Sequence, residues 1–361
     1  MTVYADEHDE LRSAVRRLLE KSAEGAAVRA TVAAGGYDTA LWRRMSDELG
    51  LPGLAIAEEH GGSGYGIVEL AVVLEEIGRA CLPSPFLSTV LAAWTLEAAG
   101  PSDVAADLLP SLAAGRQAAA VHVGAAGRPG WTLEHGRVRG VLPHVADGTA
   151  ADHLVLVAPG GGAVVDLRGP GVARSELETM DLTRDQARIT LTDAPARVLP
   201  ADGTWAGRTT ALAAVMVACE QVGGAERVLE MSTAYARERV QFGRAIGSFQ
   251  AVKHLLADML VELELARTVQ RHALELLDAA GTEPAALDAA ARSARVACSR
   301  AFARLTSDTI RVHGGIGYTW EHDAHLYFRR ARASAVLFGG GADDLDRLAV
   351  AAGLAPGGEA R

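Results

Sequence analysis

The residues with the clearest chemical potential lie in two short segments. Within "HGGIGY", Gly314 and Gly315 follow a helical segment, and because they lack a Cβ their backbone amides can approach an anion closely. Within "RVQFG", Arg239 offers a planar guanidinium that is always charged, and Phe242 offers an aromatic surface for a flat ring. Each residue also has an ordinary explanation, since arginine is frequent at helix ends, phenylalanine in cores and glycine pairs in loops. Taken singly, the residues leave both interpretations open.

A second group with chemical potential is "EHDAH", where His322 and His325 flank Asp323. Histidines three residues apart on a helix can bind one metal ion. No third ligand stands at a plausible spacing, so no metal site is predicted. Helix capping or a surface position is the expected use of these side chains.

Two helical parts of the chain must position these residues. Residues 1–115 carry helical periodicity, as in "DELRSAVRRLLEKS", and predict an all-α region. Residues 204–350 carry longer helical segments with short links, which predict a C-terminal four-helix bundle. The expected bundle helices span Thr209–Val240, Gly247–Ala280, Glu283–Val312 and His322–Phe338. The remaining residues, 351–361, are rich in glycine and are expected to form a flexible tail.

Residues 116–203, between the two helical regions, have a different sequence pattern. Short apolar runs alternate with glycine and proline, which predicts a small antiparallel β-barrel or sandwich. No Gly-x-Gly-x-x-Gly segment opens a helix after a strand, so a Rossmann site is not supported. The expected fold is α+β and mostly α: a helical region, a small β-barrel and a helical bundle.

Composition limits the possible partners and environments. The chain has 361 residues, with 35 Lys and Arg against 45 Asp and Glu, and the resulting net charge of −10 argues against a nucleic-acid partner. The N-terminus lacks the pattern of a signal peptide, and the longest apolar run is interrupted by Glu220, so no membrane span is expected. The three cysteines, Cys81, Cys219 and Cys298, are far apart and are expected to be reduced thiols of a cytoplasmic protein.

Two longer segments carry a resemblance to a known family. Residues 235–260, "YARERVQFGRAIGSFQAVKHLLADML", and residues 311–318, "RVHGGIGY", resemble the two bundle signatures of the acyl-CoA dehydrogenase flavoproteins. Glu321 and the Arg329-Arg330 pair follow the second segment as they do in that family. The order of helical region, β region and bundle also fits, so the resemblance extends over nearly the whole chain.

The resemblance implies FAD as the cofactor, bound at a seam between adjacent subunits. It places Arg239, Gln241, Phe242 and Gln250 on one side of the FAD, and Gly314 and Gly315 on the other. Arg311 stands where the family usually has a glutamine that contacts FAD, and its charge could serve a phosphate. The implied partners are an acyl-CoA or acyl-carrier thioester, an electron-transfer flavoprotein as acceptor, and further subunits in a homo- or hetero-oligomer, a dimer of dimers.

The sequence departs from the family at the catalytic base. Family members remove the α-proton of the thioester with a carboxylate while the flavin accepts a hydride from the β-carbon. Most members carry this acid in the turn after the last bundle helix, which corresponds here to Phe338 or Gly339. Others carry it early in the first bundle helix, which corresponds to Ala213 and Ala214. None of these residues can accept a proton.

The β region departs from the family as well. The Thr-Glu-Pro segment beside the flavin has no match near "AAVHVGAAGRPG". The Trp-x-Thr segment that borders the flavin ring corresponds here to His144–Ala146.

Glu220 is the one remaining candidate for the base. It lies about two turns after the alternative base position, and in an apolar helix its pKa is expected to rise, as a base requires. The alternative is a buried glutamate paired with a neighbouring helix or with Arg227. Asp343 and Asp344 follow the turn and are expected to be solvated helix caps.

Three functions remain open. The first is FAD-dependent α,β-desaturation of an acyl thioester with a relocated base. The second is a non-catalytic or half-site subunit of a heteromeric acyl-CoA dehydrogenase, which completes a partner's FAD site. The third is another flavin reaction on the same fold, such as oxygenation or desulfination.

Overall fold

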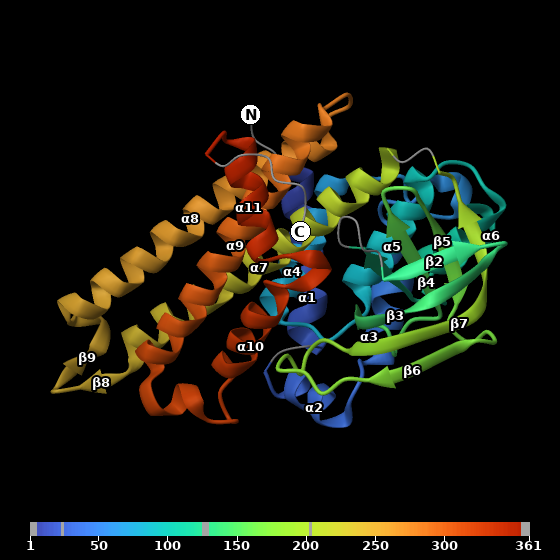
Figure 1. Cartoon of the computed structure of the whole chain (residues 1–361). Coiled ribbons are helices and arrows are strands. Elements are labelled where there is room, and N and C mark those ends of the chain that lie inside the picture. The colour runs from blue at the N-terminus through green and yellow to red at the C-terminus, as the bar shows by residue number, and fades with distance from the viewer. Residues whose placement is uncertain (1–5, 23–24, 125–129, 202–203, 355–361) are drawn as a thin grey trace.

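The N-terminal region consists of six α-helices, of which α4 and α5 contact the long helix α7 (Thr204–Glu238), whereas α6 lies beside the sheet (Figure 1). The computed structural model describes residues 6–22, 25–124, 130–201 and 204–354. The apolar stripe read from α1 is confirmed, since Val15, Leu18 and Leu19 are buried. The helices are α1 (Asp6–Ser22), α2 (Ala26–Ala34), α3 (Thr39–Asp47), α4 (Ile67–Ala80), α5 (Phe86–Ala98) and α6 (Asp103–Ala113).

A curled sheet follows and has a hydrophobic core of its own, which includes Val138, Leu154 and Ile189 (Figure 1). Its strands run in the order β1-β4-β5-β7-β3-β2, and β6 pairs with β7. The pairing of β1 with β4 is parallel, which corrects the expectation of a wholly antiparallel sheet. The β2–β3 hairpin lies between the two strands along the chain and provides the long connection that a parallel pair requires. The strands are β1 (Ala119–Val123), β2 (Trp131–Glu134), β3 (Arg137–Ala146), β4 (His153–Ala158), β5 (Gly161–Asp166), β6 (Val172–Glu176) and β7 (Gln186–Leu199).

The C-terminal region is a bundle of long helices. The predicted fourth helix ends early, at Ser334 and not at Phe338, and a 3₁₀ turn over Leu337–Gly339 follows it. Phe338 adopts the left-handed conformation (φ 51°, ψ 36°), which an α-helix does not contain. A further helix, α11, was not predicted. The helices are α7 (Thr204–Glu238), α8 (Gln250–Asp278), α9 (Pro284–His313), α10 (Ala324–Ser334) and α11 (Ala342–Ala351).

The two helical regions share one hydrophobic core. Helices α4 and α7 approach so closely that a Cβ at Gly78 would lie 1.9 Å from the carbonyl oxygen of Glu220. A Cβ at Gly223 would likewise lie 1.8 Å from the carbonyl oxygen of Glu75. Only glycine fits at these two crossing points, so α7 is fixed in place against the N-terminal helices. The fold is α+β and mainly helical, which confirms the predicted fold class.

None of the helices in the described ranges combines the length and the apolar character that a membrane crossing requires.

Candidate functional site

The fold brings the two candidate segments to the same end of the bundle. Arg239 directly follows α7, and a small hairpin of β8 (Val240–Gln241) and β9 (Arg244–Ala245) continues from it (Figure 1). Gly314 and Gly315 begin the 3₁₀ turn η4 (Gly314–Tyr318) directly after α9. The contact that joins the segments is a stack between the rings of Tyr235 on α7 and His313 on α9, whose centroids are 4.4 Å apart.

Both segments are open to solvent. Phe242 is 92% exposed at the tip of the hairpin, and Arg239 is exposed and forms no ion pair within the described residues. A Cβ at Gly314 or Gly315 would meet no heavy atom within 4 Å, so an approaching ligand has access to the backbone there. A free guanidinium, an exposed aromatic ring and accessible glycine backbone fit the diphosphate and flat rings of a dinucleotide such as FAD.

The other expected contact residues lie nearby. Gln250 is exposed at the first position of α8. The side-chain amide of Gln241 donates to the carbonyl of its neighbour Val240 at 3.0 Å. Arg311 lies in the last turn of α9, 3.0 Å from Asp308.

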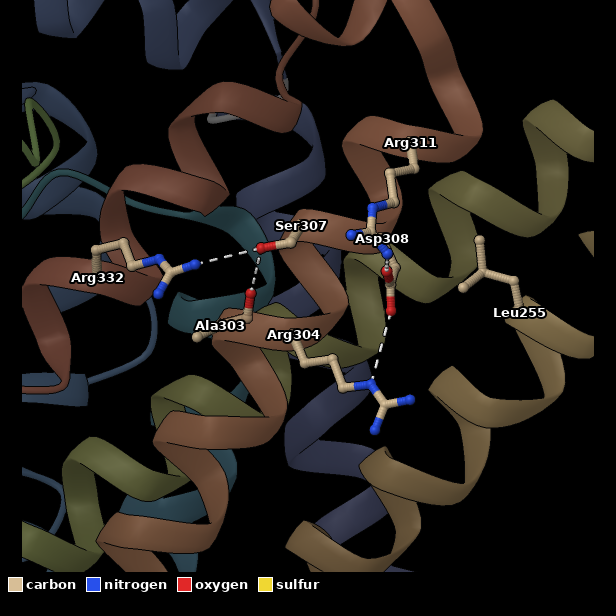
Figure 2. Close-up of a pocket in the computed structure, with 7 residues that line it drawn as sticks. All are labelled: Leu255, Ala303, Arg304, Ser307, Asp308, Arg311 and Arg332. Carbon is tan, nitrogen blue, oxygen red and sulfur yellow. Dashed lines mark hydrogen bonds and ion pairs between the residues drawn. The ribbon is translucent and has the colours of Figure 1, made fainter.

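A groove of about 400 Å³ lies along α9 and contains residues that the sequence reading did not single out (Figure 2). Arg304, Asp308 and Arg311 line it from α9, and Arg332 reaches it from α10, with its Nη2 3.4 Å from Ser307 Oγ. Arg304 is paired with Glu262 at 2.5 Å. The spacing of four and then three residues between Arg304, Asp308 and Arg311 was the available signal in the sequence, because it places these side chains on one helix face.

A second hollow, of about 450 Å³, adjoins the groove and shares Ser307 and Arg311 with it. Its remaining lining is largely aromatic and apolar, with Met180, Ile310, Gly317, Tyr318, His325, Phe328 and Arg329. The two hollows together present cationic and aromatic surfaces side by side.

Glu220 lies elsewhere, in the interior. It is only 2% exposed, and both of its carboxylate oxygens are 2.7 Å from Arg184 Nη2, while Arg330 Nη1 binds the same carboxylate. Burial alone raises the pKa of Glu220, but the two guanidinium groups lower it more, so its pKa lies below the usual value. The expected rise of this pKa is therefore wrong, and Arg227 is not the partner.

Arg330 connects Glu220 to two other parts of the fold. Its Nε lies 2.8 Å from Asp181, and its Nη2 donates to the carbonyl oxygens of Thr183 at 2.9 Å and Leu82 at 3.2 Å. The network thus ties the segment between β6 and β7 to α7, α10 and the end of α4. Glu220 precedes the end of α7 by 18 residues, or about 27 Å along a helix. It belongs to a different region from the exposed segments.

The turn at the usual base position is held by ion pairs. Arg295 Nη1 donates to the carbonyl of Phe338 at 3.2 Å, and Arg295 Nε lies 2.7 Å from Asp344. Asp344 is fully buried and also binds Arg292 at 2.7 Å, so its expected position as a solvated cap is wrong; Asp343 is exposed. Helical periodicity in the sequence does not reveal this contact, because Arg292 and Arg295 lie about 50 residues before Asp344.

The alternative base position is filled by the core. Ala213 and Ala214 on α7 are 1% and 2% exposed. Neither this position nor the turn at Phe338 offers a carboxylate.

A buried acid near the sheet was not anticipated. Asp147 follows His144–Ala146 at the end of β3, is 2% exposed, and accepts a hydrogen bond of 2.5 Å from Ser88 Oγ. Burial raises the pKa of Asp147 to about 6, and the nearby charge of Arg184 offsets only part of this rise. The neighbouring segment without a Thr-Glu-Pro match falls partly on residues 125–129, outside the described residues.

Comparison with known proteins places the chain among acyl-CoA dehydrogenases. Models of the acyl-CoA dehydrogenase N-terminal domain and C-terminal domain match residues 5–116 and 203–355. The chain is 38% identical to acyl-CoA dehydrogenase IpdE2 of Mycobacterium tuberculosis, over 95% of this chain and 96% of that protein. It is 36% identical to IpdE2 of Mycolicibacterium smegmatis, over 95% and 98% of the two chains.

Solved structures agree in fold. A variant of the Tcur3481–Tcur3483 steroid ACAD superposes with a TM-score of 0.88 at 31% identity, covering 96% of this chain and 98% of that chain. The ChsE4–ChsE5 complex from Mycobacterium tuberculosis superposes with a TM-score of 0.87 at 26% identity, covering 99% and 100%. On the strength of both domain matches and of relatives aligned over nearly its full length, this chain belongs to the acyl-CoA dehydrogenase family of oxidoreductases.

Proposed function

We propose that this chain is a half-site subunit of a heteromeric, FAD-dependent acyl-CoA dehydrogenase. It completes a flavin site together with another subunit and does not supply the catalytic base. The observation that carries the proposal is the state of Glu220, the remaining candidate acid, which is buried and neutralised by Arg184 and Arg330. A base must exchange its proton with substrate, and this carboxylate is held in its ionised form away from solvent.

The other base positions support the same conclusion. Phe338 and Gly339 occupy the turn after α10, and Ala213 and Ala214 are packed into the core. Arg295 and Asp344 hold the turn in place, so no nearby acid can replace the missing one without rearranging buried ion pairs.

The exposed end of the bundle is the part that would contact FAD. FAD, when bound, supplies the acceptor for the hydride. Arg239 and Arg311 would bind its diphosphate, the amides of Gly314 and Gly315 would approach it closely, and Phe242 would cover a ring. Gln241 and Gln250 are placed beside them and would add hydrogen bonds. These side chains face outward, as a site shared with a second subunit requires.

The relatives suggest the substrate class. One similar structure is named as a steroid ACAD with two components, and another is a complex of two different chains. We therefore propose that the complete enzyme desaturates the thioester of a steroid-derived acid and passes electrons to an electron-transfer flavoprotein.

Purification from the native source tests the proposal directly, because it asks for a second chain. We expect the native complex to contain one FAD for each pair of different chains, and the chain alone to bind FAD at well below one per chain. One FAD per purified chain, with bleaching of the flavin by an acyl-CoA, would reject the half-site assignment. It would favour a self-sufficient desaturase instead. In that case Glu220→Gln should abolish bleaching in protein that circular dichroism shows to be folded and that retains FAD; unchanged bleaching would remove Glu220 from consideration.

A further inference from the structure

Three histidines surround the turn that carries Gly314 and Gly315. His313 ends α9 and is 4% exposed, and its ring centroid lies 4.3 Å from that of His322. His325, one turn into α10, lies 4.6 Å from Trp320 between ring centroids. The turn therefore rests on a cluster of imidazole rings, the histidine cluster (His313, His322 and His325).

The hydrogen bond that His322 accepts requires a neutral ring. The backbone N–H of Ala324 donates to His322 Nδ1 at 3.1 Å, at the start of α10. A nitrogen that accepts a hydrogen bond carries no proton, so protonation of Nδ1 would remove this bond. His313 Nδ1 lies 2.8 Å from the carbonyl oxygen of Thr309 and donates its proton there, a hydrogen bond that both the neutral and the protonated ring can form. Both ring nitrogens of His325 are buried, so a proton added to this ring would be shielded from solvent.

The charges that face the cluster make further protonation costly. Arg29 from α2 pairs with Asp323, and Arg329 on α10 lies over the Trp320 ring at 5.1 Å beside His325. Asp323 is the carboxylate that faces these rings, and it is already bound to Arg29. Two cations and one carboxylate therefore act on these rings before any histidine gains a charge. Tyr235, which stacks on His313 from α7, adds no charge at neutral pH.

The pKa values of the three histidines also favour neutral rings. Burial lowers the pKa of His313, His322 and His325 below the ordinary 6.5. Neighbouring positive charges lower it further: protonated His313 and His325 and Arg29 act on His322, and Arg329 acts on His325. The unfolded or opened segment binds protons more readily than the closed one. The stability that the neutral rings contribute is thus present above pH 6.5 and is lost as the pH falls below it.

We propose that the histidine cluster makes the glycine turn acid-sensitive, so that neutral rings hold Gly314 and Gly315 in position and protonation opens the turn. The consequence for flavin binding rests on the proposed function. A protonated ring would also attract a diphosphate. Water and salt screen that attraction at the exposed turn, whereas a lost cap and a buried charge act on the turn directly.

The test is amide hydrogen exchange at residues 314–318 of the full chain without ligand, between pH 7.5 and 5.5, expressed as protection factors. In the wild type we expect protection below pH 6.5 to fall by up to about tenfold per pH unit for each histidine that titrates. His322→Asn keeps an acceptor in place of Nδ1 but cannot be protonated, so its loss should be clearly smaller. His272→Asn, at an exposed position of α8, is the matched control and should behave as wild type. Unchanged wild-type protection, or an equal loss in His322→Asn, would overturn the proposal.

Two further measurements keep the test decisive. NMR titration of the histidine rings of the wild type does not depend on any variant folding, and pKa values at or above 6.5 for all three would overturn the proposal. FAD titration of the native complex at pH 7.5 and 5.5 separates the two hypotheses. Absence of FAD at pH 7.5 would reject the proposed function and leave the exchange result standing. Equal FAD affinity at both pH values, with an opened turn, would reject the link between the turn and the flavin.

Discussion

Charged side chains gather both around Glu220 in the interior and at the exposed end of the bundle, in opposite environments. Around Glu220, Arg184 and Arg330 are almost fully buried and their charges are matched by carboxylates. At the end of the bundle, Arg239 and Arg332 are exposed and have no carboxylate within ion-pair distance among the described residues. Buried pairs hold elements together, because separating them leaves a charge without solvent. Exposed cations cost little to leave unpaired and are free to bind an anionic ligand.

A substitution in the buried ion-pair network around Glu220 should reduce the free energy of unfolding most. Glu220→Gln leaves Arg184 buried without its carboxylate partner and removes one of the two carboxylates that bind Arg330, which keeps Asp181. We expect the free energy of unfolding to fall by about 3–5 kcal/mol. Denaturant unfolding followed by circular dichroism measures it. Glu264→Gln, an exposed partner of Arg267 on α8, is the control and should change stability by less than about 1 kcal/mol. A loss below about 1 kcal/mol for Glu220→Gln would show that the network does not hold the fold together.

The ion pairs of Asp344 with Arg292 and Arg295, beside the Phe338 turn, should contribute less to stability. Asp344→Asn removes the charge between Arg292 and Arg295, but Arg292 retains Asp288 at 2.8 Å. We expect a loss of roughly 2–3 kcal/mol, because only Arg295 is left buried without a carboxylate. Asp343→Asn, at the exposed neighbouring position, should have little effect in the same unfolding experiment. Equal effects of the two substitutions would contradict the difference in burial.

Asp147 contrasts with Glu220, because it is a buried carboxylate whose pKa is raised. Its pKa is about 6 in the folded chain against an ordinary 3.8, so the folded state holds this proton more tightly. Folding stability therefore decreases as the pH rises from 3.8 to about 6 and carries the full penalty above that. Asp147→Asn should stabilise the chain at pH 8 by about 1–3 kcal/mol, and the gain should vanish near pH 3.

Thermal unfolding of wild type and Asp147→Asn across this pH range measures the difference. The asparagine retains an acceptor for Ser88 and tolerates the positive φ of 57° at this position. A variant that is less stable than wild type at pH 8 would mean that Arg184 stabilises the Asp147 charge more than burial opposes it.

The exposed region should show the smallest effect on stability and a clear effect on binding. Arg239→Gln should change the free energy of unfolding by less than about 0.5 kcal/mol, because the side chain forms no buried contact. FAD affinity of the native complex should fall roughly tenfold, as expected when one charged contact to a diphosphate is removed. Arg300→Gln, exposed on α9 and 11 residues before Arg311, is the control for loss of positive charge. Equal losses of FAD affinity would indicate a general charge effect instead of a contact.

The fold could be read from the sequence in its main features. The 3.6-residue periodicity of the long helices and the change to short apolar runs depend on local sequence, so the mainly helical α+β class was predictable. The predictions that were wrong concern contacts between residues that are distant in the sequence. The turn after α10 is held by a hydrogen bond from Arg295 on α9 to the carbonyl of Phe338, and the parallel pairing joins β1 and β4, which the β2–β3 hairpin separates in the sequence.

The site was predictable to the same extent. Arg239, Phe242, Gly314 and Gly315 were identified by residue type and motif, and the structure brings them to one end of the bundle. The groove formed with Arg332 was not identified, because that residue approaches Ser307 from another helix. Contact of any of these residues with FAD remains a prediction.

The residue types alone exclude an acid at either usual base position, because phenylalanine, glycine and alanine cannot accept a proton. The state of the remaining acid, Glu220, depends instead on how the chain folds. Arg184 lies 36 residues and Arg330 110 residues from Glu220, and their charges reverse the pKa shift that burial alone would produce. Electrostatic energy depends on distance in space, which helical periodicity does not reveal.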